Sequence, residues 1–282
     1  MSDTSQSELN LLDTAERGLT DSTEPRARRV SGITFVRDAL HRGRRIRENE
    51  SETASNRAGS EALLIRRAIV LLSGGVDSAT ALYWAKERFD EVYAMTMTYT
   101  ETYDHEIEAA KQLAAAAHVK EHFLVHLPFV TAVESKYHPT PSDKISPIYF
   151  PARNIIFYGI AAAHAEARHI GYIVFGSNAD DSTELPDARP AFIRLMNRII
   201  KAGTRTGMEG GSITIVNPLI KRSKPEVIKL AFRLHVPLQL TWSCCDETAK
   251  MPCGKCVGCE ERIKSFKMCK AADPSLNVLL KA

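Results

Sequence analysis

The residues with the clearest chemical potential form the run Ser73-Gly74-Gly75-Val76-Asp77-Ser78. An apolar run at residues 68–72 precedes it, and a helical pattern over residues 77–88 follows it. Two glycines at a strand-to-helix turn allow the backbone to approach a ligand closely. The first N–H groups of the following helix carry roughly half a positive charge. The sequence therefore predicts a site for phosphate or pyrophosphate at this turn.

The order of these residues separates the loop from two well-known phosphate loops. It matches neither G-x-x-x-x-G-K-S/T nor G-x-G-x-x-G, the patterns of P-loop NTPases and of dinucleotide-binding folds. The alternative is a glycine-rich turn that only ends a core strand. We favour the anion site because the strand, loop and helix signals agree.

Four cysteines near the end of the chain have the spacing of a metal site. The pattern C-x8-C-x2-C-x2-C is formed by Cys244, Cys253, Cys256 and Cys259. Four thiolates satisfy tetrahedral Zn²⁺, so we predict a structural zinc, with a redox pair or an iron–sulfur cluster as alternatives. Spacing alone does not choose between Cys244 and the adjacent Cys245 as a ligand. Lys255 and Arg262 are near enough in sequence to offset the thiolate charge.

The elements that must position these residues alternate along the chain. Strand-like runs cover residues 68–72, 92–99, 121–126, 172–176 and 212–216. Helix-like runs cover residues 77–88, 104–118, 153–168, 187–201 and 224–234. This alternation predicts an α/β fold with a Rossmann-like, doubly wound parallel sheet, to which the cysteines add a small C-terminal zinc-binding subdomain. Ligands of such sheets bind at the carboxyl ends of strands where the strand order reverses. Ser73 and the polar run Gly176-Ser177-Asn178 each follow a strand, so we expect them to share one cleft.

Composition limits the classes of protein to which the chain can belong. The 282 residues are 44% hydrophobic and 25% charged, which is ordinary for a globular protein. A net charge of +3 gives no argument for a nucleic-acid partner. The sequence shows neither an apolar stretch of membrane-spanning length nor the apolar core of a signal peptide, so we expect no membrane contact and a cytoplasmic location.

The first part of the chain differs in composition from the rest. Residues 1–66 contain eleven arginines and no lysine, whereas the remaining 216 residues contain eleven arginines and fifteen lysines. We predict a disordered N-terminal extension over residues 1–66, an α/β domain over 67–240 and a zinc-binding region over 241–282. Two alternatives for the extension are a short basic helix at residues 33–47 that contacts an acidic partner and a stretch upstream of the true translation start.

The loop and the cysteines together resemble a known family. The hexapeptide at residues 73–78 resembles the pyrophosphatase loop of the ATP-pyrophosphatase (PP-loop) superfamily. Within it, the 7-cyano-7-deazaguanine synthase (QueC) family is indicated by motifs in the same order over residues 67–270. These motifs are Phe150-Pro151-Ala152-Arg153-Asn154, Pro186-Asp187-Ala188-Arg189, Pro218-Leu219 through Lys224, and Thr241-Trp242-Ser243-Cys244 with the remaining cysteines. The resemblance selects Cys244 as the zinc ligand because that ligand follows the Trp-Ser pair.

The resemblance implies a ligase that cleaves ATP to AMP and pyrophosphate. Its substrates would be 7-carboxy-7-deazaguanine, ammonia and two ATP, and its product the nitrile used in queuosine biosynthesis. ATP would bind Ser73, Gly74, Gly75, Val76, Asp77 and Ser78, with Mg²⁺ at Asp77 and with Arg153 and Lys224 neutralising the phosphates. The deazaguanine ring would contact Asp181, Asp187 and Arg189. The alternatives are an ordinary surface lysine at position 224 and, for Asp187, a helix N-cap with Arg189 in a surface pair.

Three segments depart from the family pattern, and all are expected near the substrate. They are residues 99–103, residues 181–187 and Cys245, which occupies the usual place of an aromatic residue. These departures leave three other functions open: a QueC-like ligase that stops at an amide with another amine, a tRNA-modifying PP-loop enzyme, and a nucleotide-binding module without turnover. A homodimer is compatible with each of them.

Overall fold

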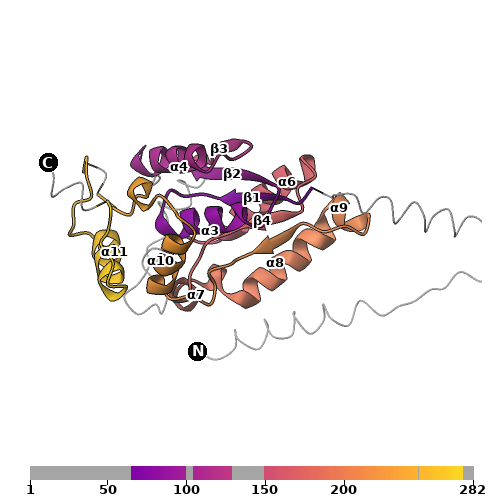
Figure 1. Cartoon of the computed structure of the whole chain (residues 1–282). Helices are drawn as coiled ribbons and strands as arrows, with labels where there is room; N and C mark the ends of the chain where they lie inside the picture. Colours follow the sequence, from indigo (N-terminus) through magenta and orange to yellow (C-terminus); the bar gives the residue numbers. More distant parts are fainter. Residues whose placement is uncertain (1–64, 100–103, 129–148, 247, 276–282) are drawn as a thin grey trace, which may run out of the picture. The chain divides into compact units, whose positions relative to one another are not determined.

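Five parallel strands form the central sheet of this computed structural model (Figure 1), which describes residues 65–99, 104–128, 149–246 and 248–275. The strands lie in the order β3-β2-β1-β4-β5. Their bounds are β1 Arg67–Leu71, β2 Glu91–Thr98, β3 His122–His126, β4 Tyr172–Val174 and β5 Thr214–Val216. The chain adds strands first on one side of β1 and then on the other, so the order reverses between β1 and β4. This parallel arrangement confirms the predicted α/β fold.

Helices cover both faces of the sheet. One face carries α3 (Val76–Lys86), α4 (Asp104–Ala116) and α10 (Lys224–Arg233), and the other carries α6 (Arg153–Ala167) and α8 (Pro190–Gly203). Alternate side chains of β1 divide between the two layers: Ala68 and Val70 pack on the first, and Ile69 and Leu71 on the second. Fully burying one such aliphatic side chain stabilises the fold by about 1.5–3 kcal/mol. Strands buried on both faces explain the continuous apolar runs of the sequence.

Most elements differ from their predicted bounds by one to three residues, and the differences at β4 and α8 have a local cause. Strand β4 ends at Val174 rather than at residue 176, because the chain turns at Phe175–Gly176 towards the start of α3. Helix α8 begins at Pro190 rather than at residue 187. Residues 186–188 form a separate 3₁₀ turn, and proline at the first helical position fixes the backbone for the new helix.

Three short helices were not predicted, namely α7 (Ala179–Glu184), α9 (Arg205–Met208) and α11 (Val257–Met268). Helix α11 begins directly after Cys256 and packs on α10, where the rings of Phe232 and Phe266 meet edge to face at 6.1 Å. The cysteine region is thereby fixed against the helical layer that also contains α3 and α10 (Figure 1).

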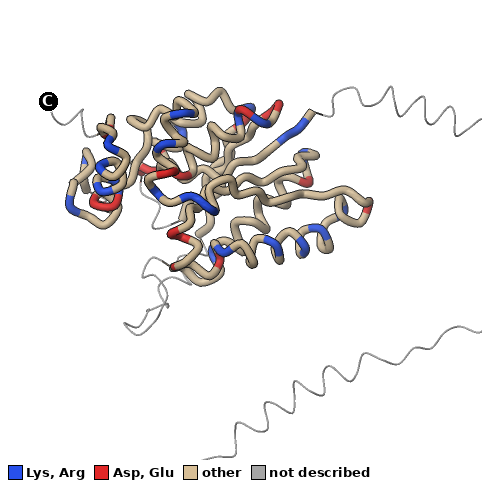
Figure 2. Tube along the Cα trace, turned by 60° about the horizontal axis from the view of Figure 1, so that its bottom comes forward, with Lys and Arg blue, Asp and Glu red and all other residues tan. Residues whose placement is uncertain are grey.

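The predicted N-terminal extension lies outside the described residues up to position 64. Lysine and arginine are interspersed with aspartate and glutamate over much of the described trace, whereas α8 carries Arg194, Arg198 and Lys201 and no acidic residue (Figure 2). Among the described residues, no helix combines the length and the apolar character that crossing a membrane requires.

Candidate functional site

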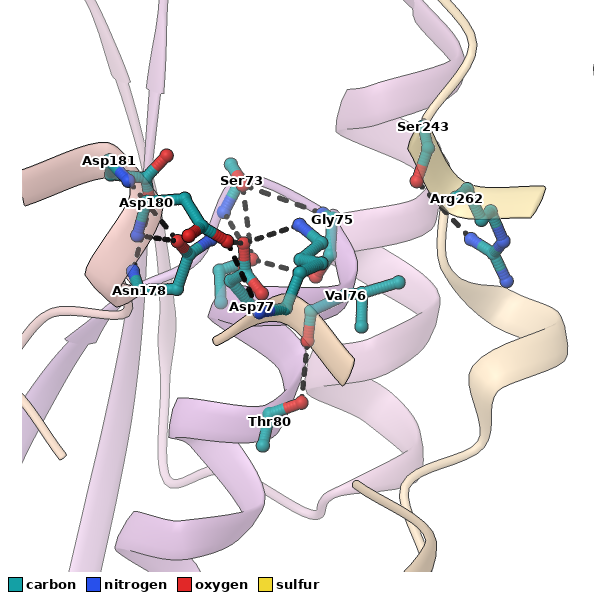
Figure 3. A network of polar contacts seen from close by, with 12 residues as sticks. Ser73, Gly75, Val76, Asp77, Thr80, Asn178, Asp180, Asp181, Ser243 and Arg262 are labelled. Carbon is teal, nitrogen blue, oxygen red and sulfur yellow. Dashed lines mark hydrogen bonds and ion pairs between the residues drawn. The ribbon is translucent and has the colours of Figure 1, made fainter. Parts of the chain in front are cut away.

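The loop between β1 and α3 has a fixed internal structure (Figure 3). The Ser78 hydroxyl donates to the Gly75 carbonyl at 3.1 Å and accepts from the Ser73 N–H at 3.1 Å. The two serine hydroxyls lie 3.0 Å apart. Gly75 is the N-cap of α3 and has extended backbone, so the first turn of the helix presents its N–H groups at the loop. These groups can bind an anion with little rearrangement.

Two glycines allow other elements to approach this loop. Gly74 has φ +90°, and a Cβ there would lie 2.5 Å from the Glu106 carbonyl oxygen at the start of α4. A Cβ on Gly176 would lie 2.7 Å from the Asp77 carbonyl oxygen. The loop therefore lies against the start of α4 on one side and against the chain leaving β4 on the other.

Asp77 is the centre of the charged network. Its Oδ2 accepts hydrogen bonds from Lys224 Nζ at 2.6 Å and from Asn178 Nδ2 at 3.2 Å. The side chains of Asp77 and Lys224 are only 16% and 18% exposed. Burial alone would lower the pKa of Lys224, but the charge of Asp77 and its hydrogen bond outweigh burial and raise that pKa. Lys224 is therefore a fixed cation, and the buried Asp77 Oδ1 has no hydrogen-bond partner among the described residues.

Asp181 belongs to the same network through Asn178. The Asn178 side chain accepts from the N–H groups of Asp180 and Asp181, and Asp181 Oδ2 accepts from the Asn178 N–H at 2.9 Å, which caps α7 at its start. Burial, aided by the charge of Asp77, raises the pKa of Asp181 to about 6, although the bond from Asn178 opposes the shift. The main-chain N–H of Lys224 donates to Asp180 Oδ2 at 3.3 Å.

Arg153 and Asp187 lie at the start of α6, and Arg189 is the N-cap of α8. Asp187 is buried and accepts from the Asn154 N–H at 3.1 Å, so its carboxylate caps α6 rather than its own turn. Arg153 Nη1 donates to the Tyr99 hydroxyl at 3.4 Å, and Arg189 is exposed. The structure therefore brings Lys224 and Asp181 to the loop and groups Arg153 with Asp187 at a second position.

Two cavities with four wall residues in common adjoin the loop. The first, of about 120 Å³, is largely apolar and lies over the ends of β1 and β2, with Met95, Met97, Tyr99, Phe157 and Phe175 in its wall. The second, of about 340 Å³, is polar and contains Asp77, Lys224, Trp242 and Glu261 in its wall. Both include Ser73, Ser78, Glu106 and Gly176. The site thus runs across the point where the strand order reverses, as the sequence predicted.

The four predicted metal ligands lie together. The sulfur atoms of Cys244, Cys253, Cys256 and Cys259 are within 4.8 Å of one another. The sulfurs of Cys244 and Cys256 are 3.9 Å apart, which suits two corners of a tetrahedron with zinc–sulfur bonds of about 2.3 Å. Burial raises the pKa of the Cys256 thiol, but the N–H groups of Cys245 and Cys259 outweigh it and lower that pKa to about 6. This set of donors fits a metal that binds thiolates.

Arg262 does not offset the thiolate charge as predicted. It is buried and forms a two-pronged ion pair with Asp273, at 2.6 and 2.9 Å. Its remaining donors bind the main chain and side chain of Thr241, the Leu238 carbonyl and the Ser243 hydroxyl. Arg262 therefore fixes the segment that leads into the first cysteine.

Several residues of the site were not identified from the sequence. Glu106 and Glu261 line the polar cavity, and His105 stacks on Trp242 with ring centroids 4.5 Å apart. None of these residues belongs to a local motif. The one available signal is position, because His105 and Glu106 lie in the helix that follows β2.

Comparisons with known proteins agree on one family. The family model described as "Queuosine biosynthesis protein QueC" matches residues 67–270. The 7-cyano-7-deazaguanine synthase of Trichodesmium erythraeum is 38% identical over 220 residues, which are 74% of this chain and 99% of that protein. The enzyme of the same name from Acetivibrio thermocellus is 40% identical over 209 residues, 72% of this chain and 94% of that protein.

Solved structures with similar folds are more distant. The NMN synthetase of Francisella tularensis has 16% identity and a TM-score of 0.44, with 74% of this chain and 78% of that chain covered. The ammonia-dependent NAD synthetase of Campylobacter jejuni has 17% identity and a TM-score of 0.42, with 79% and 86% covered.

Proposed function

The chain belongs to the QueC family of queuosine biosynthesis proteins, and we propose that its cleft converts 7-carboxy-7-deazaguanine to 7-cyano-7-deazaguanine by activating the carboxylate with ATP. The relatives are 7-cyano-7-deazaguanine synthases, which are ATP-dependent ligases that form C–N bonds. The observation that carries the proposal for this chain is the loop at residues 73–78 with the Asp77–Lys224 pair at its edge. It provides an anion site and a buried cation in one cleft.

The proposed reaction has two activation steps. A carboxylate oxygen attacks the α-phosphorus of ATP, and pyrophosphate leaves. Ammonia then displaces AMP from the acyl adenylate to give the amide. A second ATP adenylates the amide oxygen, and loss of a proton and AMP gives the nitrile. Each step makes a poor leaving group into AMP, so the protein mainly has to position the reactants and stabilise charge.

The residues divide these tasks. The N–H groups of the loop and the first turn of α3 would hold the β- and γ-phosphates, and Lys224 would stabilise the charge that develops on the departing pyrophosphate. The buried Asp77 Oδ1 suits Mg²⁺, which prefers carboxylate and phosphate oxygens and would neutralise the phosphates when bound. The apolar cavity suits the adenine ring, and Arg153 at its edge could reach a phosphate.

The deazaguanine substrate is assigned to the polar side of the cleft. Asp181 lies in the network of Asp77 and could accept hydrogen bonds from the ring, whereas the Asp187 carboxylate already caps α6. Arg189 is exposed, so a role for it requires that substrate reach the outer edge of the site. We assign a structural Zn²⁺ to the four cysteines, because four thiolates at these separations match its preferred coordination. Reduced thiols and a small-molecule substrate support a cytoplasmic enzyme, and ammonia is the nitrogen donor we propose.

The test is product analysis with 7-carboxy-7-deazaguanine, ATP and ammonium. We expect the nitrile by mass spectrometry, with two AMP and two pyrophosphate released for each nitrile formed. Release of ADP instead of AMP would overturn the proposed use of ATP. Accumulation of an amide that is not converted further would favour the alternative ligase, which the sequence departures at residues 181–187 and Cys245 keep open.

A further inference from the structure

The segment just before the first cysteine lies directly against the phosphate loop. The main-chain N–H of Trp242 donates to the Gly74 carbonyl at 3.0 Å. A Cβ placed on Gly75 would come within 3.7 Å of the Trp242 carbonyl oxygen. Both peptide groups of Trp242 therefore face the two glycines that shape the loop.

The side chain of Trp242 completes the contact from another direction. Its indole stacks on the imidazole of His105 with ring planes 20° apart, and its Nε1–H donates to the Cys244 carbonyl at 2.8 Å. His105 belongs to the first turn of α4, whose Glu106 carbonyl closely approaches Gly74. Gly74 therefore lies between Trp242 and the start of α4, and Trp242 contacts both of them.

Trp242 is itself held by the cysteine region. The residue after Ser243 is Cys244, a member of the sulfur cluster, and Arg262 binds the hydroxyls of Thr241 and Ser243 at 2.8 and 3.3 Å. Arg262 and the cluster members Cys256 and Cys259 sit at the start of α11. Figure 3 shows the contact between Arg262 and Ser243. Any displacement of this region would therefore move Trp242, the partner of the Gly74 carbonyl.

We propose that Trp242 is a positioning residue that couples the order of the four-cysteine region to nucleotide affinity. It contacts the loop through its peptide groups and the start of α4 through its ring. The inference rests on the proposed function, because it assumes that the loop binds ATP. The cysteine region would then set the geometry of the phosphate site in addition to stabilising the fold.

Steady-state kinetics of the full chain test the proposal. We expect Trp242→Ala to raise the KM for ATP by about tenfold and to lower kcat by less than about threefold, since a mispositioned loop weakens binding before chemistry. Trp242→Phe retains a ring that can stack on His105 and should recover most of the affinity. The matched control is Phe89→Ala, which removes a partly buried aromatic ring from its contact with Tyr172, beyond the end of α3 that is opposite the loop. It should lower the melting temperature by a similar amount and leave the KM for ATP unchanged.

Fluorescence provides a second readout that folding stability alone would not change. The chain has two tryptophans, so in a Trp84→Phe background the emission comes from Trp242. Titration with an ATP analogue whose α–β bridge is not cleaved should change the Trp242 emission until it reaches a plateau when the site is full. The proposal is overturned if Trp242→Ala and Phe89→Ala have the same KM for ATP, or if saturating nucleotide leaves the emission unchanged. Failure of the unsubstituted chain to release pyrophosphate would instead overturn the proposed function.

Discussion

At the scale of single residues, the contact between Lys224 and Asp77 joins positions 147 residues apart and places one buried cation beside the loop. We expect Lys224→Met to lower the rate of pyrophosphate release by about 10²–10³-fold, the usual effect of removing a group that stabilises transition-state charge. The variant should also unfold at a lower temperature, because Asp77 would be left buried without its cation.

Lys229→Met is the matched control, since this lysine lies on the same helix and is exposed. It should retain the wild-type rate of pyrophosphate release and nearly the wild-type melting temperature. A Lys224→Met variant that releases pyrophosphate as quickly as Lys229→Met would remove Lys224 from the site.

Asp181 leads to a prediction about pH. Burial, with the charge of Asp77, raises its pKa from 3.8 in the unfolded chain to about 6 in the fold. The folded state therefore binds this proton more tightly, and the resulting stability is present below pH 3.8 and is lost as the pH rises through 6. A shift of this size corresponds to about 3 kcal/mol. The Asp181→Asn side chain does not titrate. The free energy of unfolding of this variant, measured in urea, should therefore increase relative to that of the wild type between pH 4 and pH 7. If the free energies of unfolding of the variant and the wild type changed equally with pH, the raised pKa of Asp181 would be contradicted.

Local sequence patterns predict those parts of the site whose residues are close together in the chain. The loop at residues 73–78 and the four cysteines could be predicted because each set is close in sequence and its spacing carries the chemistry. The carboxylate of Asp187 could not be assigned, because the partner that it caps, Asn154, is 33 residues away. The stacking of His105 on Trp242 likewise depends on tertiary packing between segments without a shared motif.

At the scale of elements, the loop needs glycine at position 74. Gly74→Ala should displace the start of α4, because φ is +90° and the new Cβ would meet the Glu106 carbonyl oxygen at 2.5 Å. We expect a loss of more than about 2 kcal/mol in the free energy of unfolding and weak ATP binding, measured by urea unfolding and calorimetry. Gly159→Ala lies inside α6 with open space around it and should stabilise the protein by about 0.5–1 kcal/mol. Equal effects of the two changes would contradict the geometry of the loop.

The zinc site that we propose lies at the start of α11. Cys256→Ser should abolish stoichiometric zinc in the purified protein, measured by atomic emission, and lower the melting temperature, because ligation and local folding are coupled. Cys245→Ser is the control, since Cys245 is exposed and lies outside the four-sulfur cluster. Retention of zinc by Cys256→Ser and its loss from Cys245→Ser would reverse the ligand assignment.

Helices and strands with strong hydrophobic periodicity could be predicted from the sequence. Elements whose formation depends on a single turn or cap were harder to predict. All five predicted strands and all five predicted helices are present because their apolar runs are buried on one or both sides. Helix α7 was missed because it spans six residues without a buried side chain and depends on the Asn178 cap. Helix α11 was missed because its cysteines were interpreted only as ligands.

At the scale of the whole molecule, topology explains why distant motifs form one site. Strands β1 and β4 are parallel neighbours at the reversal of strand order, so the loop after β1 and Asn178 after β4 emerge at the same edge. Helix α10 packs beside α3 and brings Lys224 to that edge. This arrangement follows from the alternation of elements, but the pairing of side chains within it requires the packed structure. The division at residue 240 into an α/β domain and a zinc-binding region stays a prediction.

Removal of the segment that precedes the sheet distinguishes the proposed synthase from an RNA-binding, tRNA-modifying enzyme. The family model begins at residue 67, and the Trichodesmium relative is covered over 99% of its length by 74% of this chain. The first strand is anchored by Arg66, whose N–H donates to Asp90 at 2.7 Å, so a chain that begins at Glu61 retains this contact. We expect that truncated chain to keep its kcat/KM within about twofold and its melting temperature within a few degrees, because every described contact of the cleft is preserved. If residues 1–60 hold RNA instead, only the full chain will shift tRNA in a gel, and the shift will weaken steeply with salt. A loss of nitrile synthesis of more than about tenfold on truncation would show that the extension takes part in the reaction.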